Sequence, residues 1–278
     1  GLVGSLNVLT FLHFVLVGLG VCLIARHLGA SDLGCYTGSV LAMFLPFRIH
    51  HLNHINLISH GWLILCLYFV LQESKTSHWR NCIFAAAFAI LTFYSDHGLA
   101  LQLLLSGVFV VFFHYKKEQW KSIVSMIAYG LLGCVPFFLA FQKYPLDEFI
   151  QPQSIEAGRL SSNMLSVFMP ASNEWVFVEN WHIDFLEHGV LGNEPSLGLA
   201  MIIGLLVSVQ RTRVYIKYIC IGGFFLLLSL GPILHIGFHS FDIWMPFDMI
   251  QNTSVLSMMR APVRFVSVAS IFLSIAVA

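Results

Sequence analysis

Long runs of apolar residues alternate with short polar joints along most of the chain. A membrane-spanning helix needs about 20 apolar residues, or somewhat fewer when it is buried among neighbours. Nine runs fit this pattern, at residues 5–25, 34–47, 55–72, 81–95, 98–114, 122–142, 196–210, 214–236 and 263–278. The pattern predicts an all-α, polytopic helical membrane protein with about nine transmembrane helices.

The same pattern divides the chain into three parts. It predicts a membrane bundle of six helices over residues 1–142, an external loop or cap with an amphipathic segment over 143–195, and three further helices over 196–278. Residue 1 is Gly, and the last apolar run stops in mid-helix. We therefore expect a fragment of a longer protein, with its last helix truncated.

Basic residues fall in every second joint. These joints contain Arg26, Lys75, Arg80, Lys116, Lys117, Lys121, Arg211, Arg213 and Lys217. Lys and Arg are retained on the cytoplasmic side of membrane proteins. The pattern therefore predicts that residue 1 lies outside the cell and that the long loop is external.

Composition agrees with a membrane protein. The chain is 58% hydrophobic and 10% charged, with 14 basic and 14 acidic side chains, whereas soluble domains are about 45–50% apolar and about 25% charged. These values exclude a disordered chain and a basic nucleic-acid-binding protein. The 6 cysteines lack paired CxxC spacing and are interpreted as small buried apolar residues.

The joint after the second run contains several histidines and an arginine. His50 and His54 are four residues apart and His51 and His54 three apart, so each pair would share a helix face and could ligate a divalent metal. The segment has no Cys or acidic residue, which favours interfacial histidines instead. Arg48 has two interpretations, a phosphate ligand or a cation that extends to the membrane surface.

An acidic residue lies in the short hairpin between the fourth and fifth runs. Asp96 is followed by His97 and Gly98, and an adjacent Asp and His could act as a base and its partner. The alternative is that Asp96 caps the helix that follows. The helix cap is the favoured interpretation.

The predicted external loop is acidic and aromatic. Between residues 142 and 195 it has eight acidic residues, including Glu194, against Lys143 and Arg159. An amphipathic segment that ends at Pro170 would lie along the membrane surface and place Arg159 over the bundle, as a candidate substrate-binding residue. Carboxylates suit sugar hydroxyl groups and Trp rings suit the apolar face of a sugar. The alternative is a solvated cap whose charges bind nothing specific.

The most specific local signal is residues 260–265, RAPVRF. Pro262 suits the first turn of a helix, so Arg260 and Arg264 would flank an outward-facing helix N-terminus, which favours phosphate. The alternative is an interfacial anchor. Upstream, Gly231 and Pro232 would end the preceding helix and redirect the chain toward the same face.

With these segments in place, the chain resembles the glycosyltransferase C superfamily, and more closely an uncharacterised bacterial branch of it. The resemblance rests on four segments in order: residues 47–54 (FRIHHLNH) with Trp62, 161–170 (SSNMLSVFMP), 230–234 (LGPIL) and 260–265 (RAPVRF). It implies an all-helical membrane enzyme that transfers a sugar from a polyprenyl-phosphate carrier to a lipid, glycan or protein acceptor on the external face. The resemblance implies no cofactor other than an optional divalent metal.

The resemblance also assigns roles. Arg260 and Arg264, with Arg48, would bind the carrier phosphate, while His54 and Glu194 would position the sugar or acceptor. The catalytic acid of that superfamily lies in the first external loop, which would precede residue 1, so the catalytic residue stays unknown, with Asp96 the weak candidate. Two other functions stay open: a transporter or flippase for a lipid-linked sugar or anion, and a non-catalytic membrane scaffold.

Overall fold

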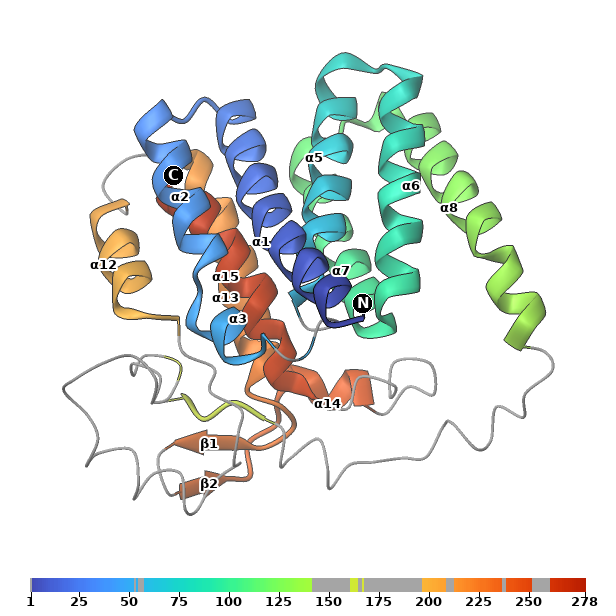
Figure 1. The fold of residues 1–278 in the computed structure, drawn as a ribbon. Coiled ribbons are helices and arrows are strands. Elements are labelled where there is room, and N and C mark those ends of the chain that lie inside the picture. Colours follow the sequence, from blue (N-terminus) through green and yellow to red (C-terminus); the bar gives the residue numbers. More distant parts are fainter. Residues whose placement is uncertain are drawn as a thin grey trace.

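The fold was examined in a computed structural model (Figure 1). The structure describes residues 2–52, 54, 58–141, 161–164, 167, 197–208, 213–236, 239–251 and 261–278. Within these ranges the chain forms eleven α-helices and one two-stranded antiparallel sheet. The predicted all-α class is confirmed, apart from this small hairpin.

The helices run up and down in a bundle (Figure 1). Their bounds are α1 Leu2–His27, α2 Asp32–Met43, α3 Pro46–His50, α5 His60–Thr76, α6 Trp79–Ser95, α7 His97–His114, α8 Trp120–Phe141, α12 Leu199–Ser208, α13 Arg213–Ser229, α14 Pro246–Gln251 and α15 Phe265–Val277. The 3-10 turns are η1 Lys117–Gln119 and η4 Pro262–Arg264, and the strands are β1 Leu234–Ile236 and β2 His239–Phe241.

Helix α15 forms the centre of the main core. Its residues from Phe265 to Ala276 are all buried, as expected of a helix that is apolar on every side. It packs against α13, α2, α12 and α1. Phe225 of α13 stacks on Phe272 of α15 with ring centroids 5.8 Å apart. The start of α15 is therefore held firmly in the bundle.

The structure corrects the predicted number of membrane-spanning helices. Each predicted run overlaps a helix, but among the described helices only Gly4–His27 and His97–His114 are long and apolar enough to cross a membrane. The run 34–47 is divided at Phe44 and Leu45 into α2 and α3, which have 12 and 5 residues. Nine transmembrane helices are therefore not supported, whereas the two long apolar helices indicate membrane association.

The run 214–236 also ends earlier than predicted. Helix α13 stops at Ser229, and Gly231 adopts a φ of 76°, a conformation that favours glycine. The chain then turns into β1 and β2, whose register pairs Leu234 with Phe241. The predicted helix break at Gly231 is confirmed, but the hairpin after it was not predicted.

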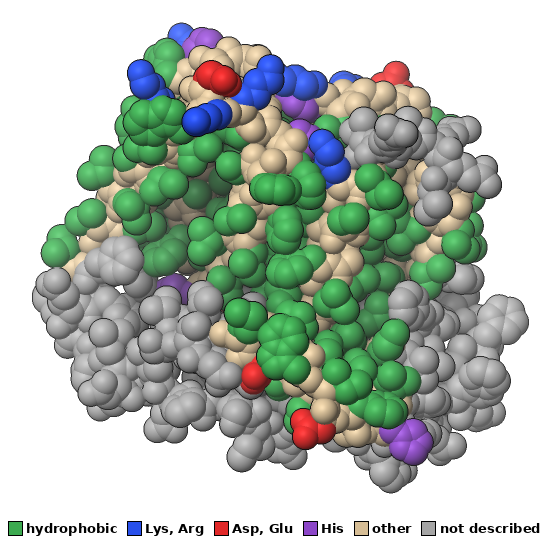
Figure 2. Space-filling model, turned by 180° about the vertical axis from the view of Figure 1, so that it is seen from behind, with side chains coloured by type: hydrophobic (Ala, Val, Ile, Leu, Met, Phe, Trp, Pro, Cys, Tyr) green, Lys and Arg blue, Asp and Glu red, His purple; other side chains and the backbone are tan. Residues whose placement is uncertain are grey.

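Basic side chains gather at one end of the bundle, where α1, α5 and α7 end. This basic end is defined by Arg26, Lys75, Arg80, Lys116, Lys117, Lys121 and Lys217. Hydrogen bonds connect neighbouring helices at the basic end. For example, Lys75 Nζ donates to the carbonyl of His27 at 2.5 Å. Figure 2 shows the Lys and Arg side chains at this end and apolar side chains over the face below. The predicted separation of basic joints is confirmed.

Candidate functional site

Asp96 begins the candidate site at the end of the bundle opposite the basic end. Its backbone is extended between α6 and α7, and Oδ1 accepts hydrogen bonds from the amides of Gly98 at 2.6 Å and Leu99 at 3.2 Å. These bonds satisfy two of the free N–H groups at the start of α7. The favoured interpretation of Asp96 as a helix cap is confirmed.

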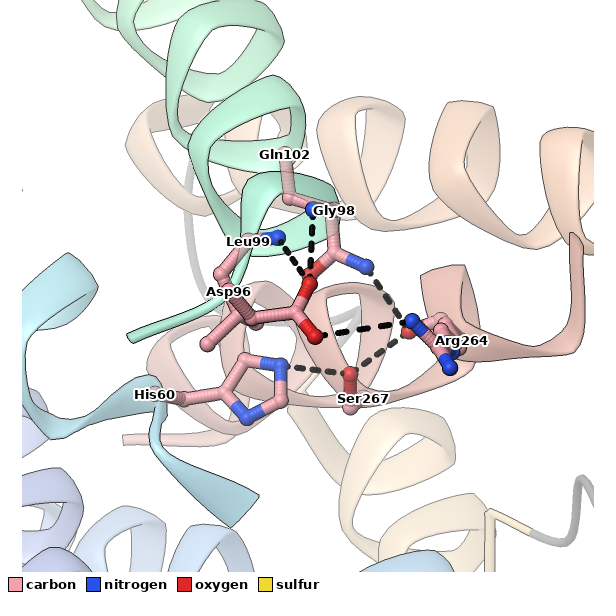
Figure 3. Close-up of polar contacts among 7 residues, drawn as sticks. All are labelled: His60, Asp96, Gly98, Leu99, Gln102, Arg264 and Ser267. Carbon is pink, nitrogen blue, oxygen red and sulfur yellow. Dashed lines mark hydrogen bonds and ion pairs between the residues drawn. The ribbon is translucent and has the colours of Figure 1, made fainter. Parts of the chain in front are cut away.

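The second oxygen of Asp96 faces Arg264. Asp96 Oδ2 and Arg264 Nη1 are 3.6 Å apart, and their side chains are 14% and 31% exposed (Figure 3). Arg264 ends the 3-10 turn that Pro262 begins and that leads into α15, so Pro262 does occupy the predicted first turn. Helix packing thus brings together a carboxylate and a guanidinium that lie far apart in the sequence.

Three polar side chains meet at the backbone carbonyl of Arg264 or next to it. Ser267 Oγ donates to this carbonyl at 2.6 Å and Gln102 Nε2 donates at 3.3 Å, while His60 Nε2 lies 2.7 Å from Ser267 Oγ (Figure 3). Because Ser267 gives its one hydrogen to the carbonyl, we assign the hydrogen of His60 to Nε2. This network fixes the backbone from which the Arg264 side chain extends.

Sequence reasoning missed His60, Gln102 and Ser267 as members of the site. The available signals were weak: Gln102 is an amide inside an apolar helix, and His60 lies at the start of an apolar run. Such polar residues in apolar helices usually face the interior of a bundle. Their convergence on Arg264 depends on the first turns of α5, α7 and α15 meeting at one place, which the sequence pattern does not give.

A small pocket lies among these residues. It is lined by Phe47, His60, Asp96, Leu99, Gln102, Arg264 and Ser267, which leave no enclosed space the size of a water molecule. The side chains fill it closely, so a ligand reaching its floor must displace one of them. The pocket joins α3, α5, α7 and α15 at one point.

Arg48 of α3 has an unusual environment. Its side chain is 0% exposed, and its guanidinium lies over the Phe14 ring, 4.6 Å from the ring centroid. In the described part of the chain, none of its three side-chain nitrogens has a hydrogen-bond partner. Burial lowers the pKa of this guanidinium to about 9. The interpretation of Arg48 as a surface-seeking interfacial cation is therefore wrong.

The predicted histidine cluster is only partly assembled. His51 Nδ1 lies 2.8 Å from the carbonyl of Phe47, and the His51 ring stacks on Phe47. His54 is exposed, with its ring centroid 5.9 Å from that of His51, and His50 ends α3 with no described side-chain position. No group of three or more His, Cys, Asp or Glu side chains suited to a metal occurs among the described residues.

The remaining predicted site residues, Arg159, Glu194 and Arg260, lie outside the described residues. Part of the predicted external loop is described, and it lies against the end of α13. The amide of Ser162 donates to the carbonyl of Ser229 at 2.8 Å, and Asn163 forms a bridge with His235 of β1. This contact places the described part of the loop at the same end of the bundle as Asp96.

The double role of Asp96 can be separated by substitution. Asp96→Ala should lower the free energy of unfolding by about 1 kcal/mol, because the helix cap is lost. Asn also caps helices well. Asp96→Asn should therefore keep most of the free energy of unfolding and lose only the charge that faces Arg264. Hydrogen exchange at the amides of Gly98 and Leu99 would distinguish the variants. Equally fast exchange in both would contradict the assignment.

Comparison with known proteins places the chain in a family without giving it an activity. No curated protein and no solved structure matches it. One family model matches residues 6–278, under the description "Domain of unknown function (DUF6311)". Because the match covers nearly the whole chain, this protein belongs to the DUF6311 family.

Proposed function

We propose that this protein is a membrane glycosyltransferase. The proposed reaction transfers a sugar from a polyprenyl-phosphate donor to a lipid, glycan or protein acceptor. The observation that carries the proposal is the Asp96–Arg264 pair, which places a carboxylate beside a guanidinium at the end of the bundle away from the basic end. A base and a phosphate-binding cation are the two groups that this transfer needs.

The proposed sidedness follows from the charges. Because the basic end would face the cytoplasm, the pocket with Asp96 and Arg264 would open on the external face of a bacterial inner membrane. Large apolar side chains are exposed between the two ends, including Phe11 of α1 at 72% and Phe112 of α7 at 77%. A lipid environment would cover these side chains. Their exposure supports a bundle that is embedded in the membrane, in which other helices cross the membrane together with α1 and α7.

The chemistry would be a direct displacement at the anomeric carbon. The acceptor hydroxyl gives its proton to a carboxylate, its oxygen forms the new bond to the anomeric carbon, and the bond from that carbon to the phosphate oxygen breaks with its electron pair on the phosphate. Arg264 would stabilise the phosphate charge as it develops. Asp96 is the described carboxylate placed beside it, so within this part of the chain it is the candidate base.

Turnover by the protein in membranes tests the proposal. Membranes containing the wild-type protein should release sugar from at least one donor in a panel of polyprenyl-phosphate sugars. The Arg260→Ala/Arg264→Ala variant should lose about 100-fold or more of this activity, in line with removing groups that stabilise transition-state charge. Lys121→Ala, an exposed change at the basic end, should retain it.

The opposite result has a clear meaning. A wild-type protein that inserts normally but turns over no donor would overturn the transferase proposal. The second candidate is then a transporter or flippase for a lipid-linked sugar or anion. The helix break at Gly231 favours it, because broken helices line many transport sites. Donor movement across vesicles without sugar release would identify this function.

A further inference from the structure

Helices α1 and α2 pack side by side and run in opposite directions (Figure 1). Two contacts define how they are aligned. A Cβ added at Gly18 of α1 would lie 3.7 Å from the carbonyl oxygen of Ser39 of α2, and the side chains of Arg26 and Asp32 form an ion pair at 2.8 Å. The stretch of α1 between Gly18 and Arg26 therefore faces the stretch of α2 between Ser39 and Asp32.

Each helix has a cysteine in the middle of this contact. Cys22 lies four residues after Gly18, and Cys35 lies four residues before Ser39. Because four residues are about one helical turn, antiparallel packing places the two cysteines opposite each other. Their thiols accordingly interact as hydrogen-bonding partners, and the positive charge of Arg26 acts on both sulfur atoms. Two thiols from different helices thus meet at one place beside a cation.

The two thiols differ in their access to water. Cys35 is 0% exposed, and its sulfur lies 3.9 Å from the carbonyl oxygen of Ala30. Cys22 is half-buried. One turn closer to the end of the helix pair, the side chains of Arg26 and Asp32 are 57% and 79% exposed, so water reaches the level next to the cysteines. A small polar oxidant would therefore meet Cys22 first.

We infer that Cys22 and Cys35 form a redox modification site, at which a peroxide converts the two thiols into a disulfide bond between α1 and α2. In the first step the O–O bond of the peroxide breaks, Cys22 becomes a sulfenic acid, and one water leaves. In the second step the sulfur of Cys35 displaces the sulfenic hydroxyl, which leaves as a second water. The two sulfur atoms lose two electrons and the peroxide oxygens gain them. A dithiol reductant reverses the change.

This arrangement has the features of a redox-sensing pair. Such pairs combine an accessible thiol, a nearby cation and a second thiol that completes the disulfide. The interpretation of the cysteines as small apolar residues accounts for the burial of Cys35, but it does not account for the meeting of two thiols beside Arg26. The pair lies one turn from the basic end, and the inference does not depend on any sugar transfer.

Counting thiols in the wild-type protein in membranes tests the inference. The protein is reduced with dithiothreitol, freed of reductant, treated with hydrogen peroxide, denatured and labelled with a maleimide. Of the 6 cysteines, two should lose their reaction with maleimide. Trypsin cuts after Arg26, between Cys22 and Cys35, so mass spectrometry should find these two tryptic peptides joined. Dithiothreitol should restore both thiols.

Three variants identify the partners. Cys22→Ser should abolish the joined peptides and the paired loss of thiols. Cys35→Ser should instead stop the reaction at the sulfenic acid of Cys22, which dimedone traps. Cys220→Ser, which changes an exposed thiol of α13, is the matched control and should form the bond as the wild-type protein does. Because Cys35 is fully buried, Cys22→Ser decides the question if Cys35→Ser does not fold.

Three results would overturn the inference. The first is unchanged maleimide labelling of the wild-type protein after peroxide treatment. The second is a disulfide that joins peptides other than those of Cys22 and Cys35. The third is the same loss of two thiols in a folded Cys22→Ser protein.

Discussion

Arg48→Met is expected to raise the free energy of unfolding in detergent by about 1–4 kcal/mol, the gain seen when buried charged groups are replaced by apolar ones of similar volume. Most core substitutions do the opposite. The reason is that the guanidinium is 0% exposed and has no hydrogen-bond partner in the described structure. Met removes the cost of burying the charge and keeps the packing on Phe14.

A second substitution makes this result specific. Arg48→Ala also removes the charge but leaves a cavity, whose cost offsets the gain, so it should be less stable than Arg48→Met. A wild-type protein that is more stable than Arg48→Met would contradict the assignment of an uncompensated charge.

The same difference should depend on pH. Arg48 lies in α3, outside the two long apolar helices, and burial lowers its pKa to about 9 in the folded protein, below its value in the unfolded chain. Above pH 9 the unfolded state therefore binds more protons than the folded state, and wild-type stability rises with pH. His13 and His60, the titratable groups that adjoin Arg48, are ordinarily neutral at this pH. The advantage of Arg48→Met should thus shrink above pH 9.

Local signals in the sequence were enough to locate the helices and the basic end. The apolar runs predicted the position of every described helix except α14, and the joints with Lys75 and Lys117 predicted the end at which basic residues gather, because both signals depend on residues close together in the sequence. The lengths of the helices were harder to predict from the sequence. Leu45 and Pro46 lie within an apolar stretch, so the break between α2 and α3 is hidden in a run that reads as continuous.

The candidate site depends on contacts between distant segments. Asp96 and Arg264 were each singled out, but not as a pair, because their meeting requires the starts of α7 and α15 to come together. The burial of Arg48 was also not predicted, since a charge at the end of an apolar run is normally expected at the membrane surface. Sequence patterns thus identified charged residues as candidates. Only the packing showed that the charge of Arg264 faces a carboxylate, whereas Arg48 has no hydrogen-bond partner in the described part of the chain.

The contact between α2 and α15 gives a second large expected effect. A Cβ added to Gly38 would lie 2.6 Å from the backbone carbonyl oxygen of Ser274. This distance is too short for any real contact, and a backbone carbonyl in a buried helix cannot rotate away as a side chain can. Gly38→Ala should therefore separate the two helices and lower the free energy of unfolding by about 1–3 kcal/mol, the usual cost of overpacking.

Gly107→Ala is the matched control, because it makes the same chemical change in another helix. A Cβ added at Gly107 of α7 meets nothing within 4 Å, so this variant should gain up to about 1 kcal/mol from the higher helix propensity of Ala. The two substitutions are thus expected to have opposite signs in thermal unfolding. A stabilised Gly38→Ala protein would show that α2 and α15 do not approach as closely as the structure places them, and since α2 leads into α3, it would also question the buried position of Arg48.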